Sequence, residues 1–117
     1  MKISNGVKYG EIWSVVYLGS IGHEYKKDRP VLIIESNRQL NITNIITLVP
    51  LTSKIENKYE DDILIQKDSR NNLNYNCLIK VHHIYSFDRL RFIRKIGEVD
   101  EEILIKVKEY LKRHFDI

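Results

Sequence analysis

The sequence is poor in the residues that build covalent or metal-bound scaffolds. Its 117 residues include a single cysteine, Cys77. One cysteine excludes an internal disulfide framework and a cysteine-rich zinc site, as expected for a protein of the reducing cytoplasm. His82 and His83 have no second clustered ligand set beside them, so we expect neither a metal site nor a cofactor.

Long apolar runs are also missing. No stretch approaches the roughly 20 residues of a membrane-crossing helix, and residues 1–6 do not develop the apolar segment of a signal peptide. The chain contains no internal repeat, low-complexity tract or interdomain linker. We therefore expect one cytoplasmic domain over residues 1–117, with no membrane segment.

Neither sign of charge dominates. Lys and Arg number 19 against 16 for Asp and Glu, which gives a net charge of +3. This mildly basic balance permits a nucleic-acid partner without requiring one. Hydrophobic residues make up 43% and charged residues 30%, so the chain has enough apolar surface to fold.

The first two thirds of the sequence read as short strands separated by polar loops. Apolar, β-branched and aromatic residues predict strands at 11–17, 30–35, 45–51, 62–65 and 77–81. We expect Pro30 at the first position of its strand, and Pro50 at an edge, a bulge or a strand end. Asn71, Asn72 and Asn74 are typical of a turn.

The C-terminal residues alone carry a clear helical period. Apolar residues recur every three or four positions, on one stripe of a helix with Asp100 as its N-cap: Ile103, Leu104, Val107, Tyr110 and Leu111. Short strands followed by one helix predict an α+β fold. We expect a small, mostly antiparallel barrel or curled sheet capped by that helix.

An 11-residue loop at 18–28 is long for a compact domain, and such loops are commonly functional. It leads into Arg29, which precedes Pro30 and is therefore biased to an extended conformation. A guanidinium there presents forked donors that match a phosphate. The alternative is a surface arginine paired with Asp28 or Glu35.

Two further segments carry candidate phosphate ligands. Thr52, Ser53 and Lys54 place two hydroxyls and an ammonium directly after an apolar strand, although such residues also satisfy the backbone of ordinary turns. A later run contains four cations with Phe87 and Phe92 interleaved, which suits phosphate contact and base stacking: Arg89, Arg91, Arg94 and Lys95. Its alternative is a solvated face whose phenylalanines point into the core.

The two histidines follow the expected strand at 77–81. If the strand continued, adjacent residues would face opposite sides, with His83 on the more apolar side and His82 toward solvent. His83 would then be a core histidine or the floor of a groove. The acidic run of Glu60, Asp61 and Asp62 is most simply a solvated turn.

An ordered set of motifs resembles the MazF/PemK (Kid) toxins of bacterial toxin–antitoxin systems. The resemblance runs from about Tyr9 to Leu111. It rests on Gly10-Glu11-Ile12-Trp13, Gly22-His23-Glu24, Arg29-Pro30-Val31-Leu32-Ile33-Ile34, Val49-Pro50-Leu51-Thr52-Ser53-Lys54, Ile84-Tyr85-Ser86-Phe87-Asp88-Arg89-Leu90, Lys95-Ile96-Gly97 and the closing helix.

This resemblance implies a Src-homology-3-like barrel of the CcdB/MazF type that forms a homodimer. It implies metal-independent cleavage of single-stranded RNA by attack of the ribose 2′-hydroxyl, leaving a cyclic phosphate. Arg29 matches the family's catalytic arginine, Thr52 its catalytic hydroxyl residue, and Glu24 an acidic loop residue implicated in some members. A small acidic antitoxin is the implied partner.

The sequence departs from the family at two places. Lys26 and Lys27 replace glycines before the Arg-Pro pair, and His82, His83 and Tyr85 replace an acidic residue, a glutamine and an arginine. Arg29 is a poor base near neutrality, so Glu24 or a histidine is the better candidate. We expect RNA contacts from Ser53, Lys54, His83, Lys26, Lys27 and Arg89.

A rival interpretation is a non-catalytic module. The same barrel would then bind RNA, or a protein such as a gyrase in the manner of CcdB. The presence of Arg29 and Thr52 argues against a degenerate site, whereas the two histidines argue mildly for divergence.

Overall fold

The computed structural model describes residues 6–16 and 28–117. Within these ranges the chain forms seven strands, two α-helices and two short 3-10 helices. In chain order they are β1 Glu11–Val16, β2 Asp28–Ile33, α1 Asn37–Leu40, β3 Ile45–Thr52, η1 Ile55–Asn57, β4 Ile63–Ile65, β5 Cys77–Ile79, β6 Tyr85–Asp88, η2 Arg89–Arg91, β7 Phe92–Glu98 and α2 Glu101–Phe115.

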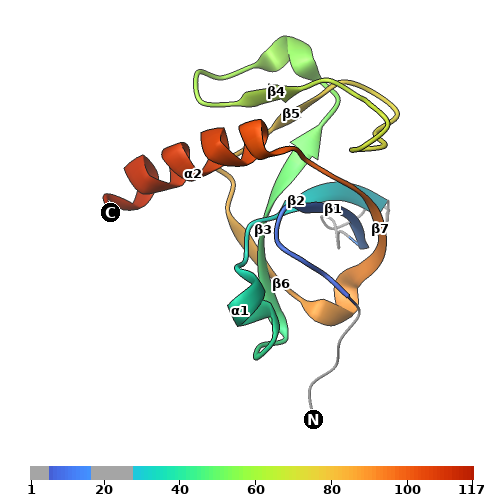
Figure 1. Ribbon diagram of the computed structural model, residues 1–117. Helices are drawn as coiled ribbons and strands as arrows, with labels where there is room; N and C mark the ends of the chain where they lie inside the picture. The colour runs from blue at the N-terminus through green and yellow to red at the C-terminus, as the bar shows by residue number, and fades with distance from the viewer. Residues whose placement is uncertain (1–5, 17–27) are drawn as a thin grey trace, which may run out of the picture.

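The strands make one antiparallel sheet in the order β4-β5-β3-β2-β1-β7, with β6 also paired to β3. Figure 1 shows the sheet curling around itself, with α2 crossing over the strands beside the β4–β5 hairpin. The expected α+β fold, an antiparallel curled sheet with a C-terminal helix, is confirmed.

Both faces of the central strands are buried, which explains their continuous apolar sequences. Neighbouring residues alternate between two core clusters: Ile12 and Leu32 belong to one, and Trp13, Val31 and Ile33 to the other. The first cluster includes Val107 and Tyr110 of α2. The second fills the curl of the sheet.

Each proline lies where β-pairing changes. Pro30 is the third residue of β2, not the first as predicted; β3 pairs with β2 from Val31 onward, so Pro30 lies beyond that pairing and faces Ser14 of β1. Pro50 lies between the segment of β3 that pairs with β6 and the segment that pairs with β5. A missing N–H is tolerated at both places.

The predicted C-terminal helix is confirmed in position and cap. The Asp100 side chain accepts a hydrogen bond from the Ile103 N–H, and Val107 and Tyr110 are buried. Gly10, at φ +84, lies under this helix, and a Cβ there would come within 3.2 Å of the Leu104 side chain. Of the helices that the structure describes, none has the length and apolar character needed to span a bilayer.

Two strands, β6 and β7, occupy the region where the sequence indicated a cationic, aromatic face. Phe92 is buried and meets Trp13 edge to face at 6.4 Å between ring centroids, and Phe87 packs against the same cluster. The phenylalanines therefore point into the core, as the alternative interpretation held. Strand β5 ends at Ile79, two residues earlier than predicted.

Candidate active site

Arg29 and Thr52 lie at neighbouring strand ends. Arg29 is the second residue of β2 and Thr52 the last of β3. The antiparallel register between the two strands ends at the pair of Val31 with Pro50, so Arg29 and Thr52 each lie two residues beyond the last pair. The strand pairing thus brings both residues to the same end of the two strands.

Two adjacent hollows meet at this pair. The larger hollow, of about 560 Å³, and the smaller hollow, of about 350 Å³, are both lined by Arg29, Leu51, Thr52 and Lys54. Arg29 and Lys54 are exposed, whereas Thr52 is half-buried. A chain of phosphates could therefore pass from one hollow to the other across the cations.

The hydroxyl of Thr52 combines a structural and a chemical role. Its oxygen accepts a hydrogen bond from the Lys54 N–H at 3.2 Å, which is the turn chemistry expected from the sequence. Because that bond uses an oxygen lone pair, the O–H proton can be donated to a phosphoryl oxygen. Ser53, also predicted to contact RNA, is exposed and lines the larger hollow.

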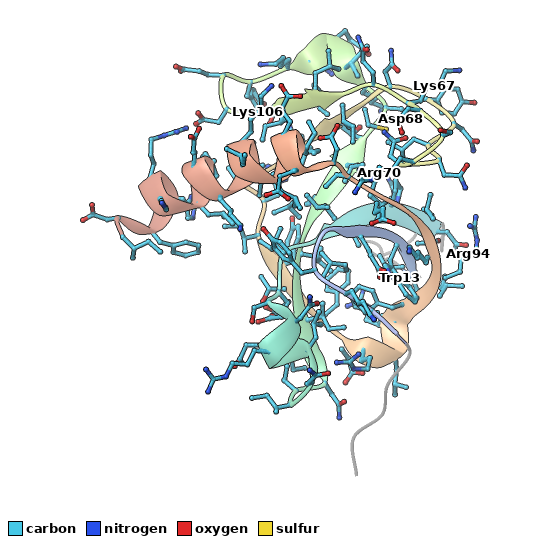
Figure 2. The ribbon with its side chains drawn as sticks, in the orientation of Figure 1. Trp13, Lys67, Asp68, Arg70, Arg94 and Lys106 are labelled. Atoms are coloured by element: carbon cyan, nitrogen blue, oxygen red, sulfur yellow. The ribbon has the colours of Figure 1, made fainter. Side chains whose placement is uncertain are left out.

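The larger hollow extends to residues whose role the sequence did not reveal. Asn72, Asn74 and Tyr75 of the β4–β5 hairpin line it together with Arg94 of β7. Figure 2 shows Arg94 on β7, with Trp13 enclosed by the curled strands. Asparagine amides and an aromatic ring are groups that can contact bases. The asparagines were recognised as a turn, but nothing in the sequence placed that turn beside Arg29.

The smaller hollow contains His83, Tyr59 and Lys80 as well as the shared residues. The predicted continuation of the strand is wrong here: the chain turns after Ile79, and the His83 N–H donates to the carbonyl of Lys80 at 2.9 Å. His83 is exposed, and His82 is half-buried. His83 lines this hollow, although a turn and not strand alternation puts it there.

The two histidine rings lie next to each other, contrary to the expectation of opposite faces. Their centroids are 4.2 Å apart at an interplanar angle of 78°. Partial burial of the ring, followed by the charges of His82 and Lys80, lowers the pKa of His83 below its ordinary value of 6.5, while Asp62 opposes the shift. Residues 6–16 and 28–117 contain no cluster of three or more His, Cys, Asp or Glu side chains suited to a metal ion.

Asp62 is buried, so the prediction of a solvated acidic turn is wrong for this residue. Its Oδ2 accepts hydrogen bonds from Lys80 Nζ at 2.6 Å and from the Tyr59 N–H at 2.9 Å. Burial by itself raises the pKa of Asp62. The hydrogen bonds from Lys80 and Tyr59 and the charges of Lys80 and His82 outweigh burial, and they hold the pKa below its ordinary value of 3.8.

Arg89 is the predicted RNA-contacting residue that the structure places elsewhere. It is only 3% exposed, and one guanidinium nitrogen donates to the carbonyls of Leu40 and Thr43. These hydrogen bonds hold η2 against the segment between α1 and β3. The assignment of Arg89 to RNA contact is therefore corrected: burial removes it from any surface that RNA could reach.

The remaining cations of that run lie in different environments. Arg91 lies over the Phe87 ring at 3.8 Å and donates to the Val16 carbonyl. Lys95 forms an ion pair with Glu11 at 3.2 Å. Of the run, Arg94 lines the larger hollow. The predicted residues Glu24, Lys26 and Lys27, with most of the loop at 18–28, lie outside the described residues.

The fold is similar to solved structures of MazF proteins. A MazE–MazF structure from Deinococcus radiodurans superposes with a TM-score of 0.79 at 18% identity, covering 97% of this chain and 99% of that one. Toxin MazF-mt6 of Mycobacterium tuberculosis gives 0.73 at 19% identity, over 92% and 97%. A mycobacterial endoribonuclease in complex with its cognate antitoxin gives 0.72 at 17% identity, over 97% of each chain.

At these identities the likeness concerns the fold, and a search among curated proteins found no match. The family follows from the sequence itself. Residues 8–115 match the family model described as a PemK-like, MazF-like toxin of type II toxin–antitoxin systems. That match includes the strands and turns that carry Arg29, Thr52 and His83. The chain therefore belongs to the PemK-like, MazF-like toxins of type II toxin–antitoxin systems.

Proposed function

We propose that this toxin is a metal-independent endoribonuclease that cleaves single-stranded RNA and so inhibits translation and growth. The observation that carries the proposal is that Arg29 of β2 and Thr52 of β3 line both of the adjacent hollows. Two of the similar structures are described as mycobacterial endoribonucleases, which supports the same activity here.

The residues fit attack of a ribose 2′-hydroxyl on the adjacent phosphate. The Arg29 guanidinium stabilises the negative charge that develops on the phosphoryl oxygens, and the Thr52 hydroxyl donates to one of them. The 2′ oxygen bonds to phosphorus, the bond to the 5′ oxygen breaks, and a cyclic phosphate remains. A separate base must take the 2′ proton, for which Glu24 and a histidine are the candidates.

The same surface suits an acidic protein partner. Arg29, Lys54 and Arg94 line the larger hollow, where Asp28 is the acidic residue among them. MazF proteins have been solved with MazE. We propose that a cognate antitoxin with an acidic flexible tail covers these cations.

We further propose that residues 1–117 form a single toxin domain, which acts in the cytoplasm as a homodimer.

The test is cleavage of a defined single-stranded RNA in EDTA by the wild type, Arg29→Ala and the control Arg38→Ala. Arg38 is an exposed arginine of α1 and lines neither hollow. We expect cleavage by the wild type and the control, and a loss of about 100-fold or more in Arg29→Ala. Undiminished cutting by Arg29→Ala would refute the assigned role, and loss of wild-type cutting in EDTA would refute metal independence.

Expression in bacteria separates this proposal from the non-catalytic rival. Growth arrest with fragmented messenger RNA is the expected result. Growth arrest with intact RNA, unaffected by Arg29→Ala, would instead indicate that the barrel binds a protein target or RNA without cutting it.

A further inference from the structure

A buried carboxylate lies behind the smaller hollow. The Asp62 side chain is 0% exposed, and its Oδ2 is bound by Lys80 and by the Tyr59 N–H. Among the described residues, Oδ1 accepts no hydrogen bond, and His82 Nδ1 lies 3.6 Å from it. An unsatisfied buried oxygen is costly, so this atom favours an imidazole N–H directed toward it.

His82 in turn packs against His83. The Tyr59, His82, His83 and Tyr85 rings form a continuous row: neighbouring centroids are 5.8, 4.2 and 6.5 Å apart, each pair near edge to face. Such a row fixes ring orientation. Its third member, His83, lines the smaller hollow with Arg29 and Thr52.

We propose that His83 is the catalytic base of the RNA cleavage reaction, and that Asp62 and His82 are positioning residues that hold its ring at the hollow. This inference rests on the proposed function and assigns the base that the Arg29–Thr52 pair lacks.

The proton balance closes without a metal or another co-reactant. The 2′-hydroxyl proton passes to an imidazole nitrogen of His83 as the 2′ oxygen bonds to phosphorus. The bond from phosphorus to the 5′ oxygen breaks, and that oxygen takes a proton from solvent water. The His83 imidazolium then returns its proton to solvent, which restores the neutral ring.

The surroundings of His83 favour the neutral ring that a base requires. Its lowered pKa keeps it deprotonated near pH 7, and its exposure lets it exchange protons with solvent. Because Arg29 and Lys54 also line the hollow, a protonated ring would meet additional positive charge. Among the described residues, the titratable and charged groups that contact the ring, line its hollow or act on it through their charge are Arg29, Lys54, Tyr59, Asp62, Lys80, His82 and Tyr85.

The first test compares His83→Gln with the control His114→Gln. His114 lies near the end of α2, bonded to the Tyr110 hydroxyl, and lines neither hollow. We expect the wild-type rate to rise with pH through an apparent pKa below 6.5 and then level off. His83→Gln should lower kcat about 100-fold or more and abolish that rise, with an unchanged melting temperature. The control should keep both rate and profile.

The second test addresses the positioning residue. His82→Phe keeps a ring against His83 but removes the charge of the imidazole and the Nδ1 that lies 3.6 Å from Asp62 Oδ1. We expect kcat to fall about tenfold with little change in KM. The rise in rate should move to higher pH, because His82 contributes to lowering the pKa of His83. A purely structural role would change stability and leave the pH profile where it was.

NMR titration of the histidine rings in the intact protein separates this inference from the proposed function. A His83 resonance, assigned through His83→Gln, should titrate below 6.5. Cleavage that depends on Arg29 but survives His83→Gln, or a His83 pKa above 7, would overturn the inference and leave the endoribonuclease standing. Absence of any wild-type cleavage with the expected titration would instead refute the proposed function.

Discussion

Lys80 Nζ lies 2.6 Å from Asp62 Oδ2, and this ion pair joins the residue before β4 to the residue after β5. The Lys80 side chain is 13% exposed and that of Asp62 is 0% exposed. Removing one member of a buried pair leaves an uncompensated charge, so we expect Lys80→Met to lower the free energy of unfolding by about 3 kcal/mol. Urea denaturation of the wild type and the variant measures this difference in the free energy of unfolding.

The matched control is the exposed ion pair between Arg113 and Asp61, at 3.1 Å. Because both of its side chains are well exposed, Arg113→Met should cost less than about 1 kcal/mol. Equal losses in the two variants would contradict the assignment of the Asp62 pair as the stabilising one.

The lowered pKa of Asp62 also predicts how stability depends on pH. A carboxyl whose pKa in the folded state lies below its unfolded value stabilises the fold above that unfolded value, here 3.8. This contribution disappears as the pH falls through the folded-state pKa. Wild type should therefore lose stability below pH 4 more steeply than Asp62→Asn, in melting curves recorded from pH 6 down to 2.5. Parallel curves would contradict the prediction.

Replacing Arg89 should lower the stability of the fold, whereas replacing Arg94 should weaken RNA binding. Arg89→Leu leaves the carbonyls of Leu40 and Thr43 without their donor, and we expect a loss of about 2–4 kcal/mol in unfolding free energy. Its cleavage rate per folded molecule should be unchanged. Arg94→Leu, at an exposed position in the larger hollow, should keep stability and weaken RNA binding with a smaller salt dependence. The reverse pattern would refute both roles.

The different positions of Arg89 and Arg94 could not be predicted from the sequence, whereas the central strands could. The central strands were predictable because runs such as Val31, Leu32 and Ile33 are buried on both faces and contain β-branched residues. Strands β6 and β7 were not predicted because their sequences mix cations with aromatic residues. The neighbouring residues in the sequence do not distinguish Arg89 from Arg94. Arg89 is buried because it bonds to the distant loop after α1, and the position of Arg94 depends on the register of β7 with β1.

The site divides in the same way. Arg29 and Thr52 were predicted through a resemblance, and the sequence does not state that the two strand ends line the same hollows. Asp62 looked like part of a solvated turn because its neighbours are acidic; its burial depends on Lys80, 18 residues later. Contacts between segments that are distant in sequence supplied what the local pattern could not.

Gly97 should tolerate no side chain. A Cβ at this position of β7 would lie 2.3 Å from the carbonyl oxygen of Asn71 and 2.6 Å from that of Arg70, both backbone atoms. Gly97→Ala must therefore push the β4–β5 hairpin away from β7, at an expected cost of about 2–3 kcal/mol in unfolding free energy. Because the hairpin carries Asn72 and Tyr75, RNA affinity should fall as well. Gly6→Ala is the comparison without a steric clash: nothing lies within 4 Å of a Cβ there, and the expected cost is the backbone strain of an alanine at φ +82, about 1 kcal/mol.

Tyr75 offers the test of whether the larger hollow receives a base. Tyr75 is 68% exposed and lines the larger hollow together with Arg94, and an aromatic ring there can stack on an unpaired base. Stacking contributes about 1–3 kcal/mol per base, so Tyr75→Ala should weaken binding about 5- to 150-fold. The probe is a single-stranded RNA with 2′-deoxy sugars at its cut sites, followed by fluorescence anisotropy. Tyr75→Phe should bind like wild type, and so should Phe115→Ala, which removes an exposed ring at the end of α2. Equal affinity of Tyr75→Ala and wild type would mean that the base lies elsewhere.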